Sequence, residues 1–149
     1  MTKEMLVYSE TLSDAKQWIA DTADTFQMMT APGNPAWPEM LPLTTITKKP
    51  LMGLLIMGST PPTFPYSFGE RGFPQNASRE VTEVYLEYTE ARYASALTRD
   101  DLEAKVGELM ILPDQQALSV RPLLVDLVRM LPDFHGDPKH QRIVFWQSV

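Results

Sequence analysis

The chain has 149 residues, no cysteine and a net charge of −6, and this length fits one domain with its own hydrophobic core. Without cysteine, disulfides, thiolate catalysis and thiolate metal ligands are excluded. The acidic balance and the lack of a basic stripe argue against nucleic-acid binding through phosphate contacts.

The N-terminal part predicts a strand followed by a helix. Residues 5–8 form a short β-prone run. Between residues 11 and 29 apolar side chains recur every three or four positions, which predicts a helix, and Thr11 with Asp14 resembles a capping box at its start. The N-terminus lacks the apolar core of a signal peptide, so we expect a cytoplasmic protein or one assembled in a particle.

A segment rich in proline follows, since nine of the thirteen prolines fall within residues 32–75. Proline fixes φ and removes an N–H donor, so residues 32–42 predict an extended arm and residues 60–75 an aromatic loop. Between these flanks, residues 43–47 predict a strand. The apolar run 51–57 predicts a strand buried on both faces, which could pair with the first as a hairpin.

Residues 79–97 fit a helix better than a strand, although both patterns are present and both readings remain open. As a helix, the segment has one apolar face and an opposite face with a row of glutamates. These glutamates are Glu80, Glu83, Glu87 and Glu90. Such a row is typical of a solvated helix face; the alternative is an acidic surface that occupies a basic site on a partner.

Two further helices are predicted in the C-terminal part. Thr98 with Asp101 resembles a capping box, and the helix that it begins should end before Pro113. Ser119 is the expected N-cap of the next helix, which places Pro122 in the first turn, where a missing N–H costs little.

A strand at residues 143–146 completes the prediction. Together the elements indicate a single domain over residues 1–149 with an α+β fold. Its core would be a small, mostly antiparallel sheet covered by about four helices, with a long Pro-rich irregular segment. No apolar run approaches the roughly 20 residues that span a bilayer.

Catalytic patterns are sparse. Both histidines lie in one short stretch with two aspartates, and these four side chains are the candidates for a metal site: Asp133, His135, Asp137 and His140. A solvated turn explains the stretch better, since the loop has no fixed ligand geometry. Asp100, Asp101 and Glu103 could form a carboxylate pair, but acids at a helix start have a simpler explanation in the helix dipole.

The chain also has no Gly-x-Ser-x-Gly, Walker A or Gly-x-Gly-x-x-Gly pattern. The sequence therefore predicts neither an enzyme nor a bound cofactor.

Aromatic and other apolar residues among the prolines are the candidates for an interface. They are Trp37, Met40, Leu41, Phe64, Tyr66, Phe68 and Phe73. They could form a lid over the protein's own core, or an arm docked on another subunit. The second reading is slightly favoured because aromatics and methionine are enriched at interface cores.

These observations favour a non-enzymatic structural or assembly subunit that acts through contacts with protein subunits, its own copies or others, in an oligomer. A small virion component, such as a phage head–tail or tail subunit, would be one example by association. An acidic inhibitor or immunity-type binding protein is the first alternative. A small metal-dependent enzyme that uses the 133–140 loop is the second.

Overall fold

The computed structural model describes residues 4–21, 42–56, 68, 71–88, 90–112 and 115–148. In chain order the elements are β1 (Glu4–Leu12), β2 (Trp18–Ala20), β3 (Thr44–Ile46), α2 (Lys49–Ile56), α3 (Arg79–Glu87), β4 (Arg92–Thr98), α4 (Arg99–Met110), α5 (Gln115–Met130), the 3-10 helix η1 (Pro138–His140) and β5 (Gln141–Ser148).

The strands form one antiparallel sheet in the order β2-β1-β5-β4. β1 and β5, from the two ends of the described chain, pair from Glu4–Ser148 to Thr11–Gln141 and make the centre of the sheet. β2 and β3 both pair with the other side of β1, β3 near its start and β2 near its end.

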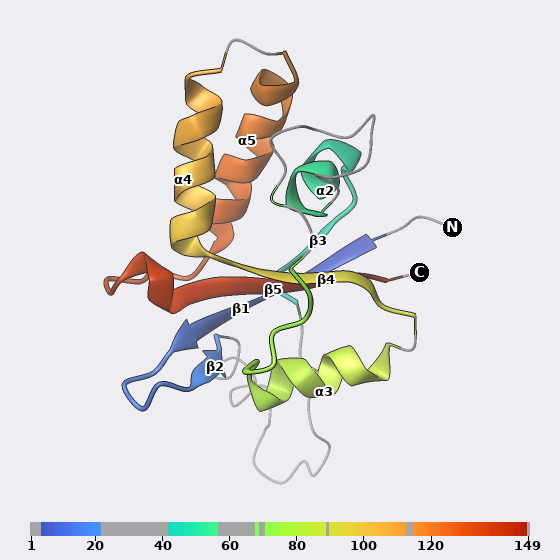
Figure 1. Cartoon of the computed structure of the whole chain (residues 1–149), viewed down its shortest axis with the longest axis vertical. Coiled ribbons are helices and arrows are strands. Elements are labelled where there is room, and N and C mark those ends of the chain that lie inside the picture. The colour runs from blue at the N-terminus through green and yellow to red at the C-terminus, as the bar shows by residue number, and fades with distance from the viewer. Residues whose placement is uncertain are drawn as a thin grey trace, which may run out of the picture.

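Helices cover both faces of this sheet (Figure 1). On one face α2, α4 and α5 pack with Met5, Val7 and Phe145 in the larger core. On the other face α3 packs with Tyr8 and Trp146 in the smaller one. Residues 5–8 and 143–146 are apolar at successive positions because β1 and β5 are buried on both sides. The α+β class with a small antiparallel sheet is therefore confirmed.

The helix predicted over residues 11–29 is wrong in the part that the structure describes. β1 continues to Leu12, and a turn at Ser13–Gln17 leads directly into β2. Lys16 takes a positive φ of 63° in this turn. The helical spacing was overridden because residues up to Thr11 pair with β5, a partner more than a hundred residues away. Residues 22–29 lie outside the described part.

In place of the buried strand predicted at residues 51–57, the structure has residues 51–56 in a helix, α2, so the expected hairpin with residues 43–47 is also wrong. Residue 57 lies outside the described part. Leu51, Leu54 and Leu55 are buried at positions i, i+3 and i+4, as one face of a helix requires. Pro50 lies in the first turn, where its missing donor costs little. β3 at Thr44–Ile46 confirms the first strand of that pair.

Residues 79–97 contain a helix, α3, followed by a strand, β4. The helix reading is right for α3, whose N-cap Ser78 accepts a hydrogen bond from the Val81 N–H at 3.3 Å. It is wrong beyond Glu87, because Tyr88 is extended and the chain continues into β4.

The capping box at the start of α4 is confirmed, with hydrogen bonds in both directions between Thr98 and Asp101. α5, in contrast, begins at Gln115 and not after Ser119. Pro122 therefore lies inside the helix and not in its first turn. In the part of the chain that the structure covers, no helix has the length and apolar character to cross a membrane.

Candidate functional site

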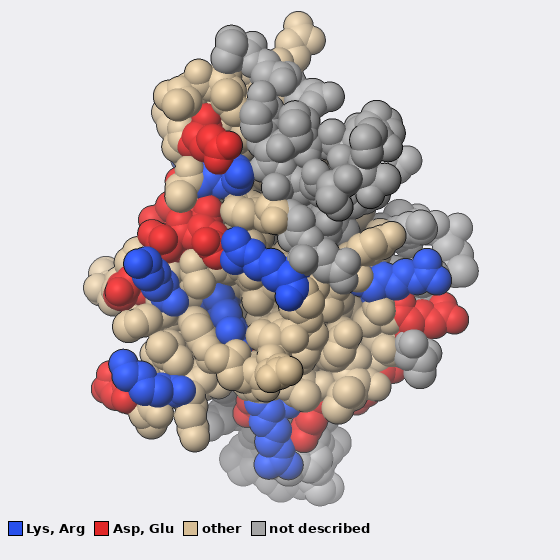
Figure 2. All heavy atoms as spheres, viewed as in Figure 1, with Lys and Arg blue, Asp and Glu red and all other residues tan. Residues whose placement is uncertain are grey.

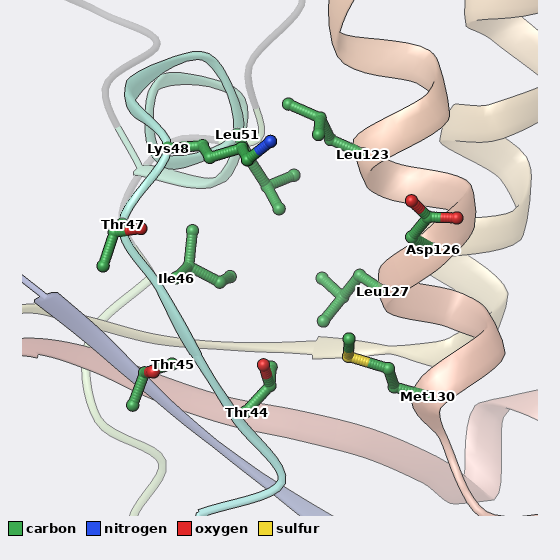
Figure 3. A pocket seen from close by; sticks show the side chains of 10 residues that line it. All are labelled: Thr44, Thr45, Ile46, Thr47, Lys48, Leu51, Leu123, Asp126, Leu127 and Met130. Carbon is green, nitrogen blue, oxygen red and sulfur yellow. The ribbon is translucent and has the colours of Figure 1, made fainter.

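A groove opens between β3 and α5 at the edge of the sheet (Figure 3). β3 and the start of α2 form one wall, and α5 forms the other. Ile46 and Leu51 point from the first wall toward Leu127 on the second. The hollow has a volume of about 210 Å3. Its full lining is Thr44, Thr45, Ile46, Thr47, Lys48, Leu51, Leu123, Asp126, Leu127 and Met130.

The groove combines an apolar floor with two opposite charges. Ile46, Leu51 and Leu127 are almost fully buried and give the floor. Lys48 and Asp126 stand on opposite walls (Figure 3), and both are exposed. Among the described residues no ion pair joins these two groups to each other or to a third. A ligand in the groove could therefore meet both charges.

The predicted interface residues fall mostly outside the described part of the chain, where Trp37, Met40, Leu41, Phe64 and Tyr66 lie. Phe68 packs against the larger core, donates its backbone N–H to the Leu54 carbonyl at 2.8 Å, and has the Lys105 ammonium 4.9 Å from its ring centre. Phe73 stacks on Tyr85 with ring centres 4.0 Å apart. These two aromatics contact their own chain.

The predicted acidic row lies on α3 and just beyond it. Glu83, Glu87 and Glu90 are exposed, and Glu80 is half-buried. Arg79 pairs with Glu83 at 3.0 Å. Leu86 is 72% exposed beside these glutamates, where its helical spacing of three from Glu83 places it, so the face is not purely acidic.

The four weak candidates for a metal site do not form one in the structure. Among the described residues, which include all four candidates in the 133–140 loop, no group of three or more His, Asp or Glu side chains could hold a metal ion. Asp137 instead caps η1 by accepting the Lys139 N–H at 2.9 Å. The solvated-turn reading explains this loop.

Two of the three candidate carboxylates at the start of α4, Asp101 and Glu103, have structural partners. Burial alone would raise the pKa of Asp101, but hydrogen bonds from the Thr98 N–H and from Arg71 outweigh it and hold that pKa below its ordinary value. Glu103 pairs with Arg99 at 2.9 Å. Figure 2 shows acidic and basic side chains side by side in this region, with no large patch of one sign on that face.

A buried ion pair on the α3 face of the sheet joins β1, β5 and the segment before α3. Glu10 and Arg142 are cross-strand partners on β1 and β5, and the carboxylate accepts from the guanidinium at 2.8 Å. The second Glu10 oxygen accepts the Ser78 N–H at 2.6 Å, and Arg142 donates to Asn76 at 3.1 Å. Trp18 covers the guanidinium at 3.9 Å. The pair attaches the segment before α3 to the sheet and is closed to a ligand.

The far end of the α4–α5 hairpin is apolar and exposed. Ile111 is 82% exposed, Met110 63% and Leu118 47%. Figure 1 shows that the end of α4 and the start of α5 lie together at this tip, away from the sheet. We call these three residues the hairpin tip. The sequence has a signal for this exposed end, because the apolar run Met110–Leu112 continues past the last turn of α4. In the structure, Leu112 packs against the larger core, whereas Met110 and Ile111 are exposed.

Comparison with protein-family models, with curated proteins and with solved structures finds no match for this chain.

Proposed function

We propose that the protein is a non-enzymatic assembly subunit that acts through protein–protein contacts, and that the hairpin tip is its contact with a second copy of the chain. The observation that carries the proposal is the exposure of Met110, Ile111 and Leu118 at one end of a helical hairpin. Large exposed apolar side chains at the same end of two neighbouring helices are candidates for an interaction site, and methionine is enriched at interface cores.

A copy of the same chain is the partner that needs the fewest assumptions. Most soluble oligomers are homo-oligomers, and the commonest form is a two-fold dimer in which the same patch faces itself. An apolar patch is complementary to itself, whereas a charged one repels itself. α4 and α5 also form a rigid support, because their inner faces belong to the larger core.

Light scattering of the wild type and of Ile111→Lys tests the proposal. Burying an isoleucine side chain contributes about 1.5–3 kcal/mol, so the variant should weaken self-association about tenfold or more. Leu86→Lys is the matched control, since it introduces the same charge at another exposed apolar position. Equal association of the wild type and both variants would refute the role of the tip.

A second candidate function is supported by the α3 face. Leu86 lies on α3 beside Glu83 and Glu87, so an exposed apolar side chain has acidic neighbours that could meet a basic surface on another protein. Binding through such a face weakens as salt rises. Parallel affinity purifications with the wild type and with Glu83→Lys/Glu87→Lys should recover a basic protein with the wild type alone. Recovery of the same proteins with both baits, at all salt concentrations, would exclude this function.

A further inference from the structure

We infer that the groove between β3 and α5 binds an extended peptide segment of a partner protein. The peptide would add to β3 as a further strand and place one apolar side chain on the groove floor. This inference rests on one premise of the proposed function, namely that the protein works through contacts with other proteins. It adds the kind of partner segment that the groove binds.

The outer edge of β3 is suited to strand addition. β3 pairs with β1 on one side, and no strand in the described part of the chain pairs with its other side. Successive backbone groups of a strand point to alternate sides, so some N–H and C=O groups of this stretch point away from β1. Residues 44–47 are threonine and isoleucine, which favour strands. Lys48, Lys49 and Pro50 follow directly and restrict the open edge to residues 44–47.

The size of the hollow favours a peptide side chain over a separate small molecule. A volume of about 210 Å3 equals that of roughly seven waters at about 30 Å3 each. Pockets for drug-sized ligands run from about 300 to 1,000 Å3. The groove therefore holds one or two apolar side chains, and the rest of the affinity must come from backbone pairing along β3.

The charges on the two walls indicate what flanks that apolar side chain. Lys48, on the side of β3, requires an acidic group, and Asp126, on the side of α5, requires a basic one. Charge-assisted hydrogen bonds of this kind are among the stronger polar contacts. The occupant is thus an extended segment with an apolar residue between an acidic and a basic residue.

Selection from a phage library of random heptapeptides tests the inference, and the tightest synthetic heptapeptide is the probe. We expect its Kd to rise about tenfold with Lys48→Glu and with Asp126→Lys, one charge-assisted contact being lost in each. Lys139→Glu on η1, which reverses the same charge at an exposed position outside the groove lining, is the control and should leave the Kd unchanged. The double variant Lys48→Glu/Asp126→Lys should prefer a peptide in which the acidic and basic residues are exchanged.

Backbone pairing is tested with the same peptide N-methylated at one position at a time. N-methylation at every second residue, where the peptide N–H points to β3, should abolish binding. N-methylation at the residues between them, whose N–H groups point away from β3, should leave binding intact. An equal effect at every position, or no heptapeptide enriched over the double variant, would overturn the inference. If Lys48→Glu instead changes the oligomeric mass of the protein in solution without any peptide, the groove is a contact between copies of the chain, and the inference is overturned. Ile111→Lys should keep the peptide affinity, so the two proposals can fail separately.

Discussion

Two aspartates, Asp21 after β2 and Asp101 in the first turn of α4, have pKa values shifted in opposite directions in the folded protein. Burial raises the pKa of Asp21 above its ordinary value of 3.8, although a hydrogen bond from the Thr11 hydroxyl opposes the shift. The pKa of Asp101 is lowered, because its hydrogen bonds outweigh burial. A raised pKa means that the folded state binds the proton more tightly than the unfolded state, and a lowered pKa means the reverse.

The two aspartates should therefore affect stability with opposite signs. Asp21 stabilises the fold below pH 3.8, and this contribution is lost as pH rises through its folded pKa. Asp21→Asn should thus raise the free energy of unfolding at pH 7, and the gain should shrink as pH falls toward 4. Asp101 stabilises the fold above pH 3.8, so Asp101→Asn should lower that free energy at pH 7 and have little effect at low pH.

Urea unfolding of both variants between pH 3 and pH 7 provides the measurement, with the wild type at each pH as the reference. A loss of stability for both variants at pH 7, with the same pH dependence, would contradict this account of the two sites.

At the scale of elements, α4 contains a residue that suits a helix poorly. Gly107 lies in its interior, and a Cβ added there would meet no atom within 4 Å. Glycine in a helix interior costs about 1 kcal/mol relative to alanine. Gly107→Ala should therefore raise the free energy of unfolding by about 1 kcal/mol.

Ala104→Gly is the matched control, since it is an exposed position in the same helix and should lower the free energy of unfolding by a similar amount. Thermal or urea unfolding of both variants gives the comparison. No change for Gly107→Ala, together with the expected loss for Ala104→Gly, would show that the glycine has a role that the helix alone does not explain.

Elements with strong local signals were predictable from the sequence. The capping box at Thr98 and the apolar run at 143–146 led to α4 and β5. The predictions were wrong where contacts with distant parts of the chain, or a short ambiguous pattern, determine the secondary structure. Residues 11 and 12 join a strand because β5 and β2 pair with them. The run 51–57 was too short for its periodicity to separate a buried strand from a buried helix.

At the scale of the whole molecule, the sheet depends on contacts between the two ends of the described chain. Glu10 and Arg142 are 132 residues apart, yet they form the buried ion pair that holds the segment before α3. No local pattern could have predicted that pair. The groove was likewise hidden, because Lys48 and Asp126 become neighbours only when β3 and α5 pack at the sheet edge.

The hairpin tip lies away from this sheet (Figure 1). The proposed assembly of the chain with its own copies depends on this surface. The natural chain has no cysteine, so a single introduced cysteine reports on one place. Met110→Cys, treated with a short bis-maleimide cross-linker, is the most direct measurement, with Glu87→Cys on α3 as its control. We expect a covalent dimer of twice 16.9 kDa for Met110→Cys and little cross-linked product for Glu87→Cys. Equal cross-linking of both variants, or none for Met110→Cys, would contradict the proposed assembly.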